Sequence, residues 1–390
     1  MRLDRRAAGV AAAGVCTFLN LYSTQAILPV LAADFHEGVG RTGLTVTAPL
    51  LAVAGMAPFI GSISDMLGRK RLIVTAAMLL VLPTALAAAA PSLNVLILCR
   101  FLQGLLLPFI FAVTVAYIGD EVQGADNIRL TGVYTVGTIV GGFCGRMVTG
   151  LATQYAGWRW AFVVLAVLTA VAAAAAGLML PAEQRFRPVR GLGSTLHSFR
   201  LHLTNRRLIA TYAVGFGVLF SIVTSFTFTN FLMAAPPYRL GPAALGAVFV
   251  VYLWGAAVTP FGGRLAVRVG RRAALGVAVA LIVAGEALTL LPALPAIIAG
   301  LAVACSGMFI EQALSIGFIS SAARTAKSTA VGLYVTSYYI GGSLGGILPA
   351  GLWQRYGWPG CVALVVLVQL LIAALVMVFW REAAPPQTAI

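Results

Sequence analysis

A short polar segment between two long apolar runs constrains this chain more than any other feature. Residues 61–71 include an aspartate and three consecutive cations, Arg69, Lys70 and Arg71. The runs on either side, 42–60 and 72–90, are each long enough to cross a bilayer as a helix. Because charged, irregular backbone cannot face lipid, the segment must turn at the membrane surface. Its cations place that surface in the cytoplasm by the positive-inside rule.

The composition also indicates a polytopic membrane protein. Of the 390 residues, 60% are hydrophobic and 9% are charged, which is more apolar surface than a soluble core could bury. The net charge of +15 would suggest nucleic acid as a partner for a soluble protein, but here the cations lie in short loops. We therefore expect a lipid bilayer as partner and no nucleic acid. The five cysteines lie in apolar runs without metal-ligand spacing, so we expect no disulfide, metal site or cofactor.

Twelve apolar runs are expected to span the membrane. The first reaches about residue 32, and its length and the many later spans favour an uncleaved helix over a signal peptide. The others lie at about 42–62, 72–90, 93–118, 129–152, 159–180, 208–233, 243–263, 273–291, 294–319, 328–350 and 357–380. This layout puts 20 of the 26 Lys and Arg on the side of both termini, four on the other side and two within spans. Both termini are therefore expected in the cytoplasm.

An internal duplication divides these spans six and six. The Gly-Gly pair at 141–142 recurs at 341–342, and the Gly-Trp pair at 157–158 recurs at 357–358. The longest hydrophilic stretch, 181–207, lies between the copies. We predict an N-terminal six-helix bundle over 1–180, a cytoplasmic linker over 181–207 and a C-terminal six-helix bundle over 208–390. Parallel repeats of this kind imply a pseudo-two-fold axis along the membrane normal and a site between the halves near the midplane.

Several local motifs carry a resemblance to a known family. The pattern Gly61-x3-Asp65-x2-Gly68-Arg69-Lys70 resembles the loop between the second and third helices of major facilitator superfamily transporters, and 263–272 is a weaker copy without the acid. The stretches 20–29, 100–104, 141–146 and 338–346 look like the arabinose-efflux-permease-like branch, close to the twelve-span drug:proton antiporters. The resemblance covers essentially the whole chain. It implies an all-α integral membrane protein with the major facilitator fold, twelve helices in two pseudo-symmetric bundles, in a bacterial inner membrane.

The segment 61–71 is also the expected cytoplasmic gate. Asp65 can pair with Arg69 near the amino end of the span 328–350, and Asp120 offers Arg69 a second partner. Such a cluster would latch the two halves in the outward-open state. The alternative is that these charges only fix the topology. The residues assigned to the gate are Gly61, Asp65, Gly68, Arg69, Lys70 and Asp120.

Four ionisable residues lie within spans, where each is costly unless it is paired or hydrated. Arg100 and Glu311 lie on spans that line the central cavity in the superfamily, and we assign proton coupling to them. The first span has no carboxylate between Asp4 and Asp34, which makes Glu311 the best proton carrier. The alternative is that Arg100 tethers neighbouring carbonyls and Glu311 is a buried structural carboxyl. Glu286 and Arg146 are expected to pack or to snorkel toward the surface.

The expected substrate cavity is built from aromatic, amide and hydroxyl groups. Such groups suit a medium-sized neutral or weakly charged solute, through stacking and a few oriented hydrogen bonds. Glycines at 137, 141 and 145 form a bare ridge that another backbone can approach, and glycines at 341, 342, 345 and 346 repeat it in the span 328–350. The resemblance implies that these two helices form contacts between the halves. The residues assigned to the cavity are Tyr22, Gln25, Arg100, Phe226, Asn230, Tyr334 and Tyr338.

These observations predict a proton-coupled exporter of a small drug- or sugar-like solute, working by alternating access as a monomer. A proton symporter or uniporter for uptake remains open, and a membrane sensor that does not transport is a more remote alternative. A membrane enzyme is disfavoured, because the chain has no His-Glu-x2-His motif and all three histidines lie in loops. ATP is not expected as energy source, because no Walker phosphate loop is present.

The predicted topology can be tested by cysteine accessibility in intact cells. We expect an impermeant maleimide to label a cysteine placed at His36 and to leave a cysteine in the linker 181–207 unlabelled. The opposite pattern, with the linker labelled from outside and position 36 protected, would contradict the layout.

Overall fold

Helices form both halves of the molecule, because a chain in lipid must satisfy its backbone hydrogen bonds within each crossing. The computed structural model describes residues 2–183, 202–323 and 327–380, without the side chains of 2–4, 62, 65, 320–321 and 327–328. The first half consists of α1 (Arg2–Leu21), η1 (Gln25–Ile27), α2 (Leu28–Asp34), α3 (Val39–Leu67), α4 (Arg69–Ala88), α5 (Leu93–Glu121), α6 (Ala125–Ala156) and α7 (Trp158–Met179).

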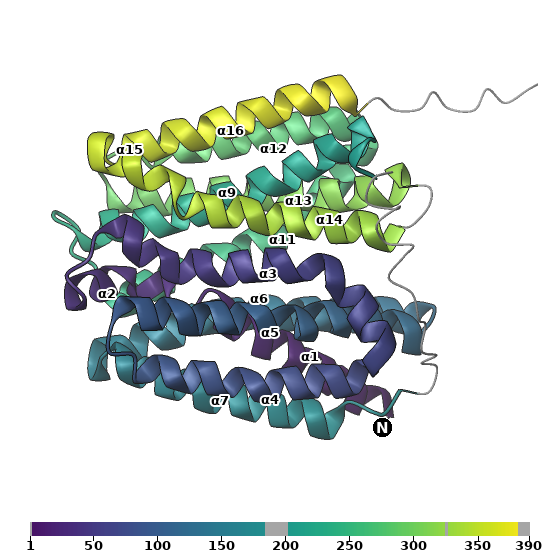
Figure 1. Ribbon diagram of the computed structural model, residues 1–390. Helices are drawn as coiled ribbons and strands as arrows, with labels where there is room; N and C mark the ends of the chain where they lie inside the picture. Colours follow the sequence, from purple (N-terminus) through teal and green to yellow (C-terminus); the bar gives the residue numbers. More distant parts are fainter. Residues whose placement is uncertain (1, 184–201, 324–326, 381–390) are drawn as a thin grey trace, which may run out of the picture.

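The second half also makes six crossings. It consists of α9 (Arg206–Ala234), α10 (Pro242–Val248), α11 (Val251–Val269), α12 (Arg271–Leu288), α13 (Leu294–Ala322), α14 (Lys327–Gly345), α15 (Leu348–Tyr356) and α16 (Trp358–Phe379). Figure 1 shows the two halves side by side, with the purple to blue helices in one and the green to yellow helices in the other. The expected linker 181–207 lies mostly outside the described residues.

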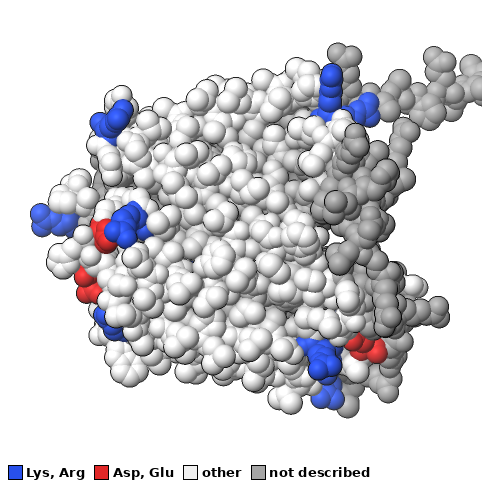
Figure 2. Space-filling view, viewed as in Figure 1, with Lys and Arg blue, Asp and Glu red and all other residues white. Residues whose placement is uncertain are grey.

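The surface agrees with a membrane-spanning body. In Figure 2 the Lys, Arg, Asp and Glu side chains lie at the two ends of the molecule, and the broad band between them is uncharged. Within the described residues, nine helical segments are long and apolar enough to cross a membrane. The remaining crossings, α6, α12 and α14 with α15, carry more glycine, hydroxyl or charged residues and run alongside the others. Together these are the twelve crossings that the sequence predicts.

Three crossings are interrupted, which the sequence did not indicate. The first bends at residues 22–24 between α1 and η1, the eighth breaks between α10 and α11, and the eleventh breaks between α14 and α15. We call the side where α1 begins and α7 ends the linker side, and the opposite side the far side. All three interruptions lie in the far-side part of their crossings, so short helical pieces (η1, α2, α10 and α15) lie on the far side.

The glycine ridge of α6 packs against α1 inside the first half. A Cβ added to Gly145 would lie 2.2 Å from the Leu19 carbonyl oxygen, and one added to Gly141 would lie 2.7 Å from that of Val15. In the second half, Gly341 of α14 approaches α9 in the same way. Gly342 and Gly346 of α14 also face Leu50 and Thr47 of α3, and Gly150 of α6 faces Pro242 of α10. The two glycine-rich helices therefore pack within their own half and also contact the other half, as the resemblance implies.

The two halves contact each other on the far side, through α3 with α14 and α6 with α10. Three hydrogen bonds there join the halves: Thr47 Oγ1 to the Ser343 carbonyl (3.2 Å), Asn230 Nδ2 to the Gln25 carbonyl (2.7 Å) and the Ala243 amide to Gln154 Oε1 (3.1 Å). We call these contacts the far-side seal.

The linker-side parts of the same helices leave more space. A Cβ added to Gly43, in the far-side part of α3, would lie 3.1 Å from the Gly346 carbonyl oxygen. One added to Gly61, in the linker-side part of α3, or to Gly332, in that of α14, would meet no atom within 4 Å. The hydrogen bonds found between the halves in the described residues thus lie at the far-side end, whereas these linker-side glycines have open space in front of them.

The packing of α6 on α1 gives a stability prediction. We expect Gly145→Ala to lower the free energy of unfolding by about 1–3 kcal/mol, because the new methyl group would overlap the α1 backbone. Gly132→Ala, on the same helix with open space in front of it, should be neutral or stabilising by about 0.5–1 kcal/mol. Thermal denaturation of the two variants in detergent would measure the difference, and equal melting temperatures would contradict the packing.

Candidate functional site

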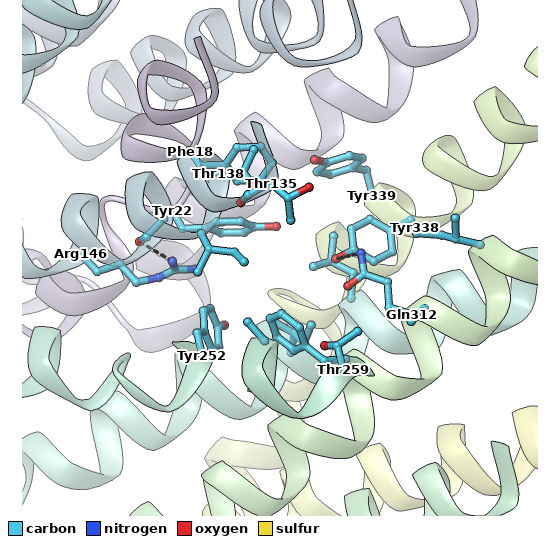
Figure 3. A pocket seen from close by; sticks show the side chains of 18 of the residues that line it. Phe18, Tyr22, Thr135, Thr138, Arg146, Tyr252, Thr259, Gln312, Tyr338 and Tyr339 are labelled. Carbon is cyan, nitrogen blue, oxygen red and sulfur yellow. Dashed lines mark hydrogen bonds between the residues drawn. The ribbon is translucent and has the colours of Figure 1, made fainter. Parts of the chain in front are cut away.

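A cavity of about 570 Å³ lies between the two halves, beside the far-side seal. Its wall comes from α1, α6, α9, α11, α13 and α14, so both halves contribute to it. Figure 3 shows the polar and aromatic side chains that surround the space: Phe18, Tyr22, Thr135, Thr138 and Arg146 from the first half, and Tyr252, Thr259, Gln312, Tyr338 and Tyr339 from the second half. Gln312 Nε2 donates a hydrogen bond to the Tyr338 hydroxyl (3.4 Å). A volume of this size accommodates an organic molecule.

Two of the seven residues assigned to the cavity from the sequence, Tyr22 and Tyr338, line it. Gln25 and Asn230 instead belong to the far-side seal, where the Asn230 side chain donates to the Gln25 carbonyl. Phe226 is buried behind the wall, in ring contact with Phe249 and Tyr252.

Tyr334, the sixth of these assigned residues, also lies away from the cavity. Its hydroxyl is 2.7 Å from Ser315 Oγ, and its ring is buried beside Tyr212 in a cluster nearer the linker side. Tyr334 and Tyr338 do stack on each other, as expected from their spacing of four. Of the two rings, only that of Tyr338, which lies nearer the far side, reaches the cavity.

Arg100 holds the interruption of the first crossing together. Where α1 ends, the carbonyls of its last residues lose their helical donors. The Arg100 guanidinium donates to the carbonyls of Asn20 (2.8 Å) and Leu21 (2.5 Å), and its Nε donates to the Thr45 carbonyl of α3 (3.0 Å). It also bonds the Gln103 side chain. Arg100 is completely buried and does not line the cavity, so its geometry is that of a tether between α1, α3 and α5.

Arg146 lies where the sequence did not place it. We expected it to pack or snorkel near the surface, but it is 1% exposed and lines the cavity. The centre of its guanidinium group is 4.6 Å from the ring centroid of Tyr22, 4.5 Å from that of Phe249 and 4.8 Å from that of Tyr252. Its Nε donates to Gln25 Oε1 (2.8 Å). The break between α10 and α11 brings the two second-half rings to it, and hydropathy gave no signal for that break.

Glu311 is buried within the second half and does not line the cavity. Neither of its carboxylate oxygens has a hydrogen-bond partner, so it forms no pair with Arg100. The carboxyl lies beside the side-chain amide of Gln369 on α16, whose oxygen also lacks a donor. Gln369 Nε2 donates to Ser221 Oγ (3.0 Å). Three buried acceptors without donors therefore gather around Glu311.

Glu286 differs from Glu311 although both are completely buried. One of its oxygens accepts a hydrogen bond from Ser225 Oγ on α9, which ties α12 to α9. Glu286 was expected to pack or snorkel, and the structure shows it packed.

The segment 61–71 forms a polar cluster on the linker side of the first half. Arg69 pairs with Asp120 and donates to Ser64 Oγ (2.8 Å). The Glu183 carboxylate accepts hydrogen bonds from the backbone amides of Arg69 (2.6 Å) and Lys70 (3.2 Å), at the amino end of α4. Sequence analysis missed Glu183, because a lone acid after an apolar span gives no pattern. The side chain of Asp65 lies outside the described residues, and the gate assignment stays a prediction.

Gly68 forms the turn between α3 and α4 in this cluster. Its φ of 87° is one that glycine adopts readily, and a Cβ there would lie 2.6 Å from Glu183 Oε1. The glycine is thus needed both for the turn between α3 and α4 and for the approach of the carboxylate. Gly61, also assigned to the gate, is an ordinary helical residue of α3 with open space in front of it.

Comparison with known proteins decides the family. The model of the Major Facilitator Superfamily matches residues 10–236, more than half of the chain. The chain belongs to the major facilitator superfamily. It is 32% identical over 367 residues to the inner membrane transport protein YnfM of Escherichia coli (strain K12), covering 93% of this chain and 87% of that protein. It is 30% identical over 358 residues to the uncharacterized MFS-type transporter YybF of Bacillus subtilis (strain 168), covering 91% and 88%.

Solved structures agree on the fold of this superfamily member. The nucleoside transporter NupG superposes with a TM-score of 0.79 at 14% identity, covering 96% of this chain and 99% of that one. A bacterial homologue of the human lysosomal transporter Spinster, in an inward-facing and unoccupied conformation, gives 0.78 at 14% identity, covering 98% and 99%. The fold is therefore that of a multi-pass membrane transporter.

The tether formed by Arg100 can be tested by its effect on stability. We expect Arg100→Gln to lower the free energy of unfolding by about 3 kcal/mol or more, because buried carbonyls would each lose a donor at about 1–3 kcal/mol. Arg355→Gln, which changes an exposed arginine of α15, is the matched control and should change the melting temperature little. An Arg100→Gln protein as stable as the control would contradict the tether.

Proposed function

We propose that the protein is a proton-coupled exporter of a small organic solute. In this proposal it lies in the bacterial inner membrane as a monomer, with the linker side in the cytoplasm. The two halves rock about the cavity and expose it to one side at a time. The family supports transport, and the cavity between the halves supports a small organic molecule as the solute.

The observation that carries the proton coupling is the environment of Glu311. A buried carboxylate without a cation or a donor is strongly disfavoured, whereas a protonated carboxyl is not. Glu311 lies near the middle of α13, away from both surfaces. We propose that this carboxyl is protonated in the present state and releases its proton when the halves rearrange.

The far-side seal supports alternating access. The cavity ends at contacts that are made by side chains and backbone groups of both halves, so it cannot reach the far side unless those contacts break. The polar contacts among them are ordinary hydrogen bonds and ring contacts. In this arrangement an exporter would take its solute from the linker side and release it on the far side.

The test is flux in proteoliposomes under an imposed pH gradient, with a solute found by a thermal-shift screen of sugars, organic acids and cationic drugs. We expect Glu311→Gln to abolish accumulation driven by the gradient, because the amide cannot bind and release a proton. Exchange of labelled for unlabelled solute without a gradient should continue. Glu286→Gln, the other buried carboxyl of the second half, is the matched control and should keep gradient-driven accumulation.

Full gradient-driven transport by Glu311→Gln would overturn the role of Glu311. The same vesicles show the direction of solute movement relative to the proton, because an antiporter accumulates the solute in the acidic compartment. Accumulation in the alkaline compartment would instead establish a symporter, and flux that ignores the gradient would establish a uniporter.

A further inference from the structure

We infer that the cavity binds a monovalent organic anion, with a carboxylate on Arg146 and an apolar or aromatic body against the rings of the wall. The inference rests on the proposed transport function for the role of the cavity and adds the chemical class of the solute. It differs from the neutral or weakly charged solute expected from the sequence, because the structure brings Arg146 into the wall.

The charge of Arg146 is not balanced by an acid. Among the cavity-lining residues of the structure there is no aspartate or glutamate, and Arg146 is the one cation. The guanidinium interacts with neutral groups alone: the Gln25 amide, the Gly142 carbonyl (2.6 Å) and three aromatic rings. Ring faces attract a cation, at about 0.5–2 kcal/mol each, but they do not neutralise it. The cavity therefore keeps a positive charge that a bound anion would balance.

Buried groups without hydrogen-bond partners lie on the Arg146 guanidinium and beside it. Arg146 Nη2 is buried without a hydrogen-bond partner, and so is Nε2 of Gln25, whose Oε1 is already held by Arg146. The hydroxyl of Tyr252, in ring contact with the guanidinium, is a third buried group without a partner. Two of these groups can only donate. A carboxylate supplies acceptor oxygens that an arginine binds in a planar arrangement, whereas a cation or an amine would leave the donors unpaired.

The rest of the wall fits an apolar body. Its apolar side chains include Phe18, Leu219, Ile222, Phe309 and Ile316, with threonine, glutamine and tyrosine groups among them. Figure 3 shows Arg146 at one end of the space and Gln312 with Tyr338 at the other, so a molecule could lie with its charged group on Arg146 and its apolar part toward α13 and α14.

The arrangement also links the anion to the far-side seal. Arg146 belongs to α6 of the first half, whereas Phe249 and Tyr252 belong to the second. The Gln25 that holds Arg146 Nε also accepts from Asn230 through its carbonyl. When the halves separate on the far side, Arg146 would lose two of its three rings and gain access to water. Binding of the anion would thereby weaken as the cavity opens to that side.

The test uses three probes of matched shape and different charge: phenylbutanoate, phenylbutanamide and phenylbutylamine. Binding to purified protein at neutral pH is measured by calorimetry, without a gradient. We expect the carboxylate to bind at least about ten-fold more tightly than the amide or the amine, as a charge-assisted hydrogen bond allows. Arg146→Gln should remove that preference and leave the amide unaffected. Arg146→Lys should keep part of it, and the control Arg355→Gln should keep all of it.

Each outcome separates the explanations. Equal binding of carboxylate and amide, tighter binding of the amine, undiminished carboxylate binding by a folded Arg146→Gln protein, or no binding of any probe would overturn the anion site. If Arg146→Gln fails to fold, Arg146→Lys decides. A partly reduced preference for the carboxylate would support the anion site, and an undiminished preference would contradict it. Carboxylate binding that depends on Arg146 without any flux in proteoliposomes would refute the proposed function and leave the anion site standing.

Discussion

The architecture depends on how the interrupted first crossing satisfies its backbone. A carbonyl within a bilayer must find a donor in the protein. At the end of α1, the guanidinium of Arg100 supplies donors to Asn20 and Leu21 and ties them to α3. The interruption turns the chain so that Gln25 meets both Arg146 and Asn230. One buried cation thus positions the far-side seal and one wall of the cavity without touching the cavity itself.

Two sets of unpaired groups in the interior differ in character. Around Arg146 and Gln25, buried donors lack acceptors, whereas around Glu311 and Gln369, buried acceptors lack donors. An anion would complete the first set and a proton would complete the second. The two sets lie in different halves, so a transport cycle in which solute and proton influence each other must couple them through the rocking of the halves. Arg100, whose donors point at carbonyls and amides that it already binds, belongs to neither set.

The sequence predicted the crossings well, because apolar length and the distribution of Lys and Arg are local properties. The Arg69 pair with Asp120 was also predictable, since the motif and the helix ends are fixed by the topology. The cavity was not. Helix interruptions leave no mark on hydropathy, and they decide that Tyr22 lines the cavity while Gln25 belongs to the seal. The position of Arg146 near the end of a span suggested snorkelling for the same reason. In the structure, Phe249 and Tyr252 enclose it, because the break between α10 and α11 brings them there.

The central claim is that the far-side seal is one of two alternating closures. Distance measurements between pairs of spin labels test it directly, in a protein whose native cysteines are replaced. One pair is placed at the exposed positions Tyr155 and Tyr356 on the far side, and the other at Ile128 and Val267 on the linker side. During transport, the account predicts a population in which the far-side distance lengthens and the linker-side distance shortens. Distances that stay fixed at both ends, or that change in the same direction at both, would contradict it.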